Sequence, residues 1–422
     1  MTEAMAAAST PESLDAQDDL RGFRARFHFP ETSNGVEPIY LTGNSLGLMP
    51  KHAREYVDQE LEDWQRHAVH GHANARRPWL PYHESLTEPM AKVVGALPVE
   101  TVVMNSLTVN LHLLLVSFYR PTKERYKIVV ERGSFPSDRY AVVSQIRFHG
   151  FDPADALIEL TPRVGEATIR TEDILSTIES EGSKVALVML GGVNYYTGQA
   201  FQMREITEAG HRAGAVVGFD LAHAAGNLKT ELHDWDVDFA CWCTYKYLNG
   251  GPGAVGGAFV HERHAREFHL PRFAGWWGHD KETRFIMGPE FNCLPGAEGW
   301  QISNPPILQM AALRASLEIF DEAGIDALRK KSVNLTGYAE ALIKAIGSDR
   351  LSVITPADPE QRGCQLSLSV SGDGKSLYHQ LIDRGVYCDW REPNVIRVAP
   401  TPLYNSFQDV YRFSEILSDC LM

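Results

Sequence analysis

Short apolar runs and amphipathic stretches alternate between about residues 100 and 260. The apolar runs are "KIVVERG", "ALIEL", "VALVMLGGV", "AVVGFDLA", "VDFACWC" and "GAVGGAFVH". Helical periodicity separates the earlier ones, near 137–148 and in "TEDILSTIESEG" and "MREITEAGHRAGA". Strands that are apolar throughout are typical of a mostly parallel sheet with helices on both faces. The pattern predicts an α/β fold whose ligand binds at the carboxyl ends of the strands.

After residue 305 the pattern changes to a long helical region, the strands "GCQLSLSV" and "VIRVAP", and a terminal helix that Asn405 or Ser406 would cap. This predicts a second, smaller α+β domain. We expect an N-terminal arm and part of the small domain in 1–60, a large domain in 61–304 and the C-terminal small domain in 305–422. The small, acidic start "MTEAMAAASTPESLDAQDD" is expected to be a mobile arm.

Composition narrows the class of protein. The 422 residues are 44% apolar and carry a formal charge of −14 without long runs of one sign, which disfavours nucleic acid or an anionic membrane as partner. The six cysteines form no Cys-x-x-Cys pair, the apolar runs are too short to span a bilayer, and the N-terminus does not resemble a secretory signal. We expect a soluble, cytoplasmic enzyme that acts on a small molecule.

One lysine stands where a strand should end. In "DFACWCTYKYLNGGPG", Lys246 follows an apolar run and precedes a glycine-rich turn. A buried cation is costly unless it is paired, neutralised or covalently modified. The strand "VVGFDLAHAAG" ends at Asp220, so both groups should lie on the ligand-binding edge. A lysine that forms a Schiff base and an acid that binds a pyridine nitrogen are what pyridoxal phosphate (PLP) requires. Taken singly, Asp220 could cap a helix and Lys246 could extend to solvent.

Two further segments supply what PLP would need. "MNSLTVNLHLLLVSFY" places Ser106, Leu107 and Thr108 at the start of an apolar helix, where free N–H groups and a hydroxyl could bind a phosphate. An ordinary helix cap explains the same residues. "RGSFPSD" offers Phe135 to cover a ring and Asp138 beside it, although a core phenylalanine in a turn fits equally well.

These segments, in this order, resemble the kynureninase family, which consists of PLP-dependent hydrolases of fold type I. The resemblance runs from about residue 40 to the end, is closest to eukaryotic-type members, and includes "LTGNSLGLMPK", "VHGHANARRPW", "YYTGQ", "GFDLAHAAGN", "GWWGH", "ISNPPIL" and "IRVAPTPLYNSF". It implies a homodimer with active sites at the subunit interface.

The resemblance also implies roles for individual residues. Lys246 would carry PLP and Asp220 would bind its ring nitrogen. The rest of the cofactor pocket would be Leu107, Thr108, Phe135, Asp138, His223 and Tyr245, with Trp276 and Asn304 from the neighbouring subunit. The substrate would contact Ser45, His72, Ser303, Asn304 and, through its α-carboxylate, Arg397. Relatives have serine where this chain has Gly191, so one hydroxyl contact to PLP is missing.

The implied reaction is hydrolysis of the Cβ–Cγ bond of a kynurenine-type amino acid to an anthranilate and L-alanine. Tyr196 is our candidate acid/base near the substrate ketone. A histidine and an asparagine in the ring pocket favour 3-hydroxykynurenine or another substituted analogue over kynurenine. The pathway could be tryptophan catabolism, NAD biosynthesis or secondary metabolism.

Three alternatives are weighed against this interpretation. A cysteine desulfurase or selenocysteine lyase of the same fold would need a nucleophilic cysteine, and Cys364 lies in a predicted buried strand. A non-catalytic protein of the same fold has no need for Lys246 and Asp220. The histidines of "HAVHGH" and "HERHAREFH" have spacings that could bind a metal, but we interpret them as polar helix faces and expect no metal site.

Overall fold

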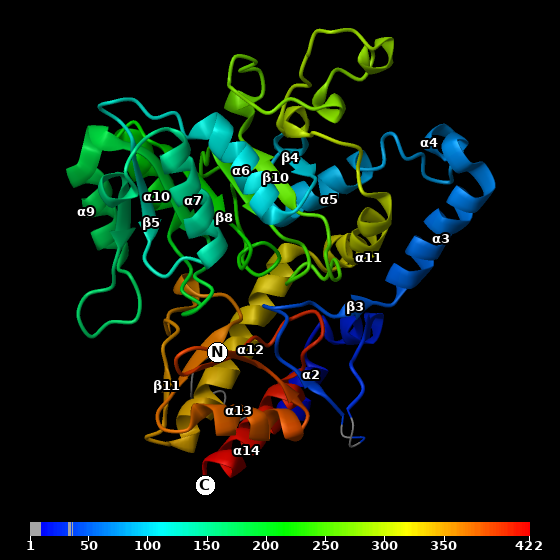
Figure 1. Ribbon diagram of the computed structural model, residues 1–422. Coiled ribbons are helices and arrows are strands. Elements are labelled where there is room, and N and C mark those ends of the chain that lie inside the picture. The colour runs from blue at the N-terminus through cyan, green and yellow to red at the C-terminus, as the bar shows by residue number, and fades with distance from the viewer. Residues whose placement is uncertain (1–9, 33–34, 36) are drawn as a thin grey trace.

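The computed structural model describes residues 10–32, 35 and 37–422 (Figure 1). In this part of the chain the largest sheet has seven strands in the order β4-β10-β9-β8-β7-β5-β6. All neighbours in it pair in parallel except β10, which is antiparallel to β4 and β9. The bounds are β4 Thr101–Val103, β5 Lys127–Glu131, β6 Leu157–Leu160, β7 Val185–Gly191, β8 Val216–Asp220, β9 Phe239–Trp242 and β10 Gly257–Val260. The prediction of a mostly parallel α/β sheet is confirmed.

Both faces of this sheet are buried, as its apolar strands require. In β7, Val188 and Leu190 pack with α9 (Thr171–Glu181) and α10 (Met203–Arg212). Leu187 and Met189 point to the opposite face and pack with α6 (Leu107–Phe118) and α7 (Pro136–Phe148). The predicted helix near 137–148 is therefore α7.

The strand order places several carboxyl ends side by side. β5 lies between β6 and β7, so the chain changes direction across the sheet there and the ends of β5, β7 and β8 are neighbours. Such a switch point leaves a crevice at the carboxyl edge of a parallel sheet. Asp220, the last residue of β8, pairs with Gly191 of β7 and Cys241 of β9.

A smaller antiparallel sheet lies below the large one in Figure 1, in the order β11-β12-β15-β14. Its strands are β11 Leu351–Val353, β12 Leu366–Val370, β14 Asp389–Arg391 and β15 Val395–Val398, and α12 Ile325–Ile346, α13 Gly374–Asp383 and α14 Phe407–Leu421 pack with it. The side chain of Ser406 caps α14, as predicted. An N-terminal strand, β2 Ile39–Tyr40, pairs with β13 Val386–Tyr387, so early residues join this part of the fold.

The long helical region after residue 305 divides between the two sheets. α11 (Ile307–Ala323) packs against α3 (His52–His67) and α5 (Glu84–Val94) and belongs to the core around the large sheet. α12 contributes Leu335 and Tyr338 to the core around the small sheet. The domain limits at residues 60 and 304 stay predictions. The short elements are β1 Phe27–His28, β3 Met49–Pro50, α4 Gly71–Asn74 and α8 Pro153–Ala156.

The expected mobile arm is wrong for the residues that the structure describes. Residues Pro11–Ala16 form helix α2, which packs against α14. Asp15 accepts hydrogen bonds from the backbone N–H groups of Phe407 (2.7 Å) and Gln408 (3.1 Å), the first residues of α14. A carboxylate at a helix N-terminus is stabilising, and this contact orders the segment. Residues 1–9 of the predicted arm lie outside the described residues.

Within residues 10–32, 35 and 37–422, every helix is too short or too polar to cross a lipid bilayer.

Candidate active site

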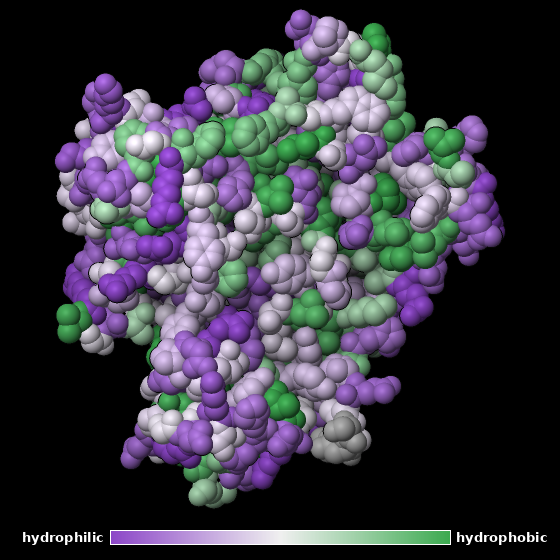
Figure 2. All heavy atoms as spheres, in the orientation of Figure 1, coloured by the Kyte–Doolittle hydropathy of each residue, from purple (hydrophilic) through white to green (hydrophobic). Residues whose placement is uncertain are grey.

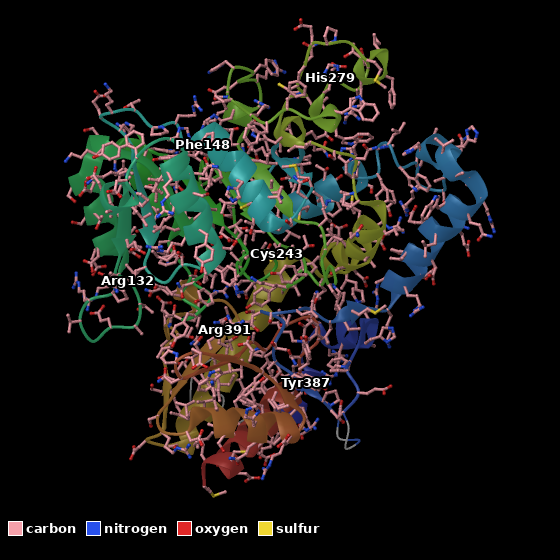
Figure 3. The ribbon with its side chains drawn as sticks, viewed as in Figure 1. Arg132, Phe148, Cys243, His279, Tyr387 and Arg391 are labelled. Atoms are coloured by element: carbon pink, nitrogen blue, oxygen red, sulfur yellow. The ribbon has the colours of Figure 1, made fainter. Side chains whose placement is uncertain are left out.

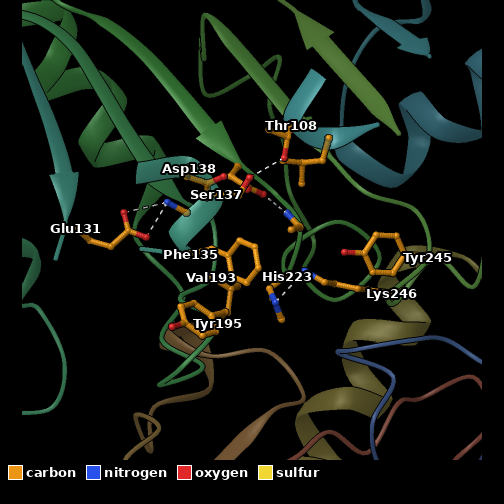
Figure 4. Close-up of a pocket in the computed structure, with 14 residues that line it drawn as sticks. Thr108, Glu131, Phe135, Ser137, Asp138, Val193, Tyr195, His223, Tyr245 and Lys246 are labelled. Carbon is orange, nitrogen blue, oxygen red and sulfur yellow. Dashed lines mark hydrogen bonds between the residues drawn. The ribbon is translucent and has the colours of Figure 1, made fainter. Parts of the chain in front are cut away.

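A cavity opens at the carboxyl ends of β5, β7 and β8, beside the N-termini of α6 and α7 (Figure 4). Eight of the residues predicted for the cofactor line it, namely Leu107, Thr108, Phe135, Asp138, Asp220, His223, Tyr245 and Lys246. The prediction that Asp220 and Lys246 share the ligand-binding edge is confirmed.

Lys246 projects into this cavity from the loop after β9. Its Nζ lies 3.1 Å from Nε2 of His223, 5.8 Å from the centre of the Phe135 ring and 5.7 Å from that of Tyr245. Among the described residues, no carboxylate forms a salt bridge with it. The backbone approach is close, because a Cβ at Gly47 would lie 2.3 Å from the Lys246 carbonyl oxygen. A half-buried lysine without a salt-bridge partner in the described structure fits the modified lysine that the sequence led us to expect.

Three carboxyl groups are buried around the same cavity. Asp220 is 6% exposed, Asp138 9% and Glu131 3%. Burial raises the pKa of Asp220 and, together with the nearby Asp220 charge, that of Asp138. Burial also raises the pKa of Glu131 to about 7. Of these groups, Asp138 Oδ1 is buried with no hydrogen-bond partner in the described structure. Three carboxyl groups and one lysine line the cavity, so a cationic ring nitrogen would be stabilised in it.

His223 is held in its neutral form. Burial lowers its pKa, and the charges of Lys246 and Arg397 lower it further. A neutral imidazole can accept a hydrogen bond from the Lys246 ammonium at the observed distance. His223 thus contacts the lysine without adding positive charge.

Two helix N-termini converge on the other side of the cavity. Along α6, Asn110 is the first residue whose N–H donates to a backbone carbonyl, that of Ser106. The backbone N–H groups before it have no such acceptor in the described structure. The hydroxyls of Thr108, in α6, and Ser137, in α7, lie 2.9 Å apart (Figure 4). Free N–H groups, two helix dipoles and two hydroxyls form a binding site that suits a phosphate dianion.

Six lining residues were not predicted to bind cofactor or substrate: Glu131, Ser137, Gly191, Val193, Tyr195 and Ala222. Ser137 follows the predicted Phe135 at a helix start, so the signal that indicated Thr108 could have found it. Gly191 donates its N–H to Glu131, and a Cβ there would lie 3.1 Å from Glu131 Oε1. The carboxyl group of Glu131 therefore occupies the space beside the residue where serine was expected.

Seven predicted residues lie outside the described lining of the cavity: Ser45, His72, Tyr196, Trp276, Ser303, Asn304 and Arg397. Tyr196 is adjacent to the lining residue Tyr195, with ring centres 6.3 Å apart. Trp276 is 40% exposed, and Ser303 and Asn304 are exposed. Arg397 is buried and donates hydrogen bonds to Asp389 and the Tyr195 carbonyl. Their proposed roles stay predictions.

The cysteine required by the desulfurase alternative is not reactive. Cys364 is fully buried, and burial raises the pKa of its thiol to about 12. A thiol with such a pKa is protonated at neutral pH and is a poor nucleophile.

The interpretation of "HERHAREFH" as a polar helix face is wrong. His261 is buried beside Glu100 and His233, and His264 donates to the buried carboxylate of Asp238. The segment contains only the short 3-10 helix Glu262–His264. Spacing alone could not show that distant carboxylates meet these rings. His261 Nδ1 accepts a hydrogen bond from the backbone N–H of Arg263, so a protein group already occupies the lone pair that a metal ion would need.

Comparison with known proteins finds kynureninases that are similar to this chain over nearly its whole length. A kynureninase from Koribacter versatilis is 62% identical over 414 residues, covering 97% of this chain and 98% of the relative. A kynureninase from Nematostella vectensis is 50% identical over 427 residues, with 96% and 92% covered. Bacterial and eukaryotic members thus both match, and the bacterial one of these two is the more similar.

The fold has relatives among solved structures. A variant of C-DES, solved with glycine covalently linked to its PLP cofactor, superimposes with a TM-score of 0.76 at 16% identity and covers 94% of this chain and 99% of its own. At this identity the likeness shows the fold alone. The family model of the kynureninase C-terminal domain matches residues 328–417. The chain belongs to the kynureninase family.

Proposed function

We propose that this chain is a PLP-dependent hydrolase that cleaves the Cβ–Cγ bond of kynurenine-type amino acids to an anthranilate and L-alanine. The observation that carries the proposal is the unpaired ammonium of Lys246 in a cavity with the buried carboxyl group of Asp220. Turnover of kynurenine by the purified protein, followed through the fluorescence of the anthranilate product, tests it. Lys246→Ala should abolish that turnover.

The residues present fit PLP. Lys246 would bind its aldehyde carbon, Asp220 its ring nitrogen, and Thr108, Ser137 and the start of α6 its phosphate. Phe135 and His223 would lie against the ring. When bound, PLP supplies an electron sink for the bonds at the substrate Cα.

The chain's own groups would handle the protons. Asp220 would keep a proton on the nitrogen that it binds, because a protonated nitrogen would compensate the buried carboxylate. The amine of Lys246 takes and returns the proton at the substrate Cα. His223, being neutral, can accept a hydrogen bond from that amine and orient it.

Tyr196 is proposed as the acid/base at the substrate ketone. Burial and the neighbouring Tyr195 raise its pKa, so the phenol keeps its proton at neutral pH and can donate it. Because Tyr195 lines the cavity itself, the two tyrosines need to be compared. Turnover of Tyr196→Phe should fall well below that of Tyr195→Phe; the reverse order would assign the role to Tyr195.

A ring-substituted substrate such as 3-hydroxykynurenine is proposed, with Ser45, His72, Ser303 and Asn304 around the ring. Supporting this, Nδ1 of His72 is buried without a hydrogen-bond partner in the described structure. A polar atom of this kind favours a ligand that carries a matching group. A higher kcat/KM for kynurenine than for 3-hydroxykynurenine would contradict the assignment.

We propose that the protein acts as a homodimer in which Trp276 and Asn304 complete the partner's site. The loop around Trp276 exposes several large apolar side chains: Phe268, Phe273, Phe285, Ile286, Met287 and Phe291. Apolar side chains are visible at the top of Figure 2, in the region where Figure 3 places His279 of the same loop. Exposed apolar patches of this kind mark protein interfaces. Light scattering should give twice the mass of the chain.

A cytoplasmic location completes the proposal. The structure shows all six cysteines as free thiols, four of them buried, which suits a reducing compartment.

A further inference from the structure

Arg397, which was predicted to bind the substrate carboxylate, already forms an ion pair with a carboxylate of the protein. β14 and β15 pair antiparallel, and Asp389 lies directly opposite Arg397. The Arg397 guanidinium donates from Nε to Asp389 Oδ1 (2.7 Å), from Nη2 to Asp389 Oδ2, and from Nη1 to the Tyr195 carbonyl (2.6 Å). Arg397 is only 1% exposed. This is a buried bidentate ion pair.

The pair creates a difficulty for any anionic ligand. The charges of Arg397 and Asp389 cancel, so an arriving carboxylate meets a neutral pair and not a free cation. To bind Arg397 it must share the guanidinium with Asp389 or displace it. A carboxylate displaced into a partly buried site needs another cation, because an unpaired buried charge is costly.

That second cation is Arg391. Residues two apart in a strand share a face, so Arg391 projects on the same side of β14 as Asp389. Its Nη2 lies 3.3 Å from Asp389 Oδ2, the oxygen that Arg397 Nη2 also contacts. The Arg391 side chain is 37% exposed and therefore keeps room to move. Figure 3 shows Arg391 near the junction of the two sheets, on the side of the small one.

Arg391 is also close to the catalytic cavity. Burial lowers its pKa, and the charge of Arg397 lowers it further. The charges of both arginines reduce the pKa of His223, which lines the cavity. Arg391, Arg397 and Asp389 together carry a net charge of +1 beside the site, and Asp389 lies between the two guanidinium groups.

We propose that Arg391 is a positioning residue: it holds Asp389 while Arg397 binds the α-carboxylate of the substrate. The inference rests on the proposed function, because it needs a ligand carboxylate at Arg397. No bond is made or broken; one oxygen of Asp389 changes its guanidinium partner. Arg391 itself does not touch the substrate.

The test uses the PLP-loaded enzyme and two probes, L-alanine and L-alaninamide, which differ in the carboxylate. Binding is read from the absorbance of the cofactor. Arg391→Gln should raise Kd for L-alanine and KM for kynurenine by about two- to fivefold, the upper part of the range for a partly exposed ion pair. The Kd for L-alaninamide should stay within twofold of wild type, and kcat should fall less than KM rises. Arg391→Lys should restore most of the loss.

Two further variants separate positioning from simple charge. In an Asp389→Asn background there is no carboxylate to hold, so adding Arg391→Gln should change the L-alanine Kd by less than twofold. Arg384→Gln, which removes an exposed partner of Asp419, is the matched control and should behave as wild type. Equal weakening of both probes, no effect of Arg391→Gln, or an undiminished effect in the Asp389→Asn background would overturn the proposal.

The failure of this inference differs from a failure of the proposed function. A wild-type protein that does not turn over kynurenine overturns both. Normal turnover with an Arg391→Gln variant that matches wild type overturns the role of Arg391 alone.

Discussion

The hydroxyl of Thr108 gives the sharpest prediction about how the cavity holds its cofactor. Thr108→Ala removes one of the two hydroxyls that meet 2.9 Å apart at the N-termini of α6 and α7. If the PLP phosphate binds there, Thr108 donates a hydrogen bond to a charged group. Such a bond contributes about 1.5–3 kcal/mol. The Kd for PLP should therefore rise by about 10- to 150-fold.

The measurement is a titration of the PLP-free protein with PLP, followed by absorbance at equilibrium. Ser137→Ala should weaken binding by a similar factor, whereas Thr108→Ser should bind nearly as well as wild type. Ser144→Ala is the matched control, because Ser144 lies in the same helix as Ser137 but donates its hydroxyl to the Ala141 carbonyl. A Kd for Thr108→Ala within twofold of wild type, or an equal loss in Ser144→Ala, would refute a phosphate site at these helix ends.

Three other predictions follow from buried charges. Asp220→Asn keeps the shape of the side chain but removes its charge, so kcat for kynurenine should fall on the order of 10²- to 10³-fold while PLP stays bound in the absorbance spectrum. Asp238→Asn leaves donors from His211, His264 and Arg263 around a weaker acceptor, and the free energy of unfolding in urea should fall by about 3–5 kcal/mol; an unchanged urea midpoint would contradict this. The hydrogen bond to Glu100 raises the pKa of His233 in the folded protein above its ordinary value of 6.5. Protonated His233 therefore stabilises the fold fully at pH values below 6.5, and this stabilisation is lost as the pH rises through the pKa of the folded state. The thermal midpoint should fall over that range in wild type and fall less in His233→Gln.

The sequence predicted the large sheet well because its signal is local. Runs such as "VALVMLGGV" are apolar on both faces, and only a strand covered by helices on both sides buries them. The edge that carries Lys246 and Asp220 follows from the same pattern, since parallel strands end together. Thr108 was found because a helix start next to that edge has free N–H groups.

What the sequence did not reveal depends on contacts between distant segments. α2 is ordered because Asp15 binds the start of α14, and His261 is buried beside Glu100, which ends the short 3-10 helix Pro98–Glu100. Neither partner is visible from spacing. The pairing of Arg397 with Asp389 was also missed, because the register of two short strands places them opposite each other. A place at the end of a regular element did not decide which pocket residues were predicted, because Lys246 was predicted although a loop carries it, and Glu131 was missed although it ends β5.

The covalent attachment of PLP at Lys246 is the central claim, and borohydride reduction tests it most directly. After reduction of the purified protein, proteolysis and mass spectrometry should find a phosphopyridoxyl group on the peptide that contains Lys246, and on no other lysine. A protein that contains PLP and turns over kynurenine but carries the label elsewhere, or carries none, would contradict the account.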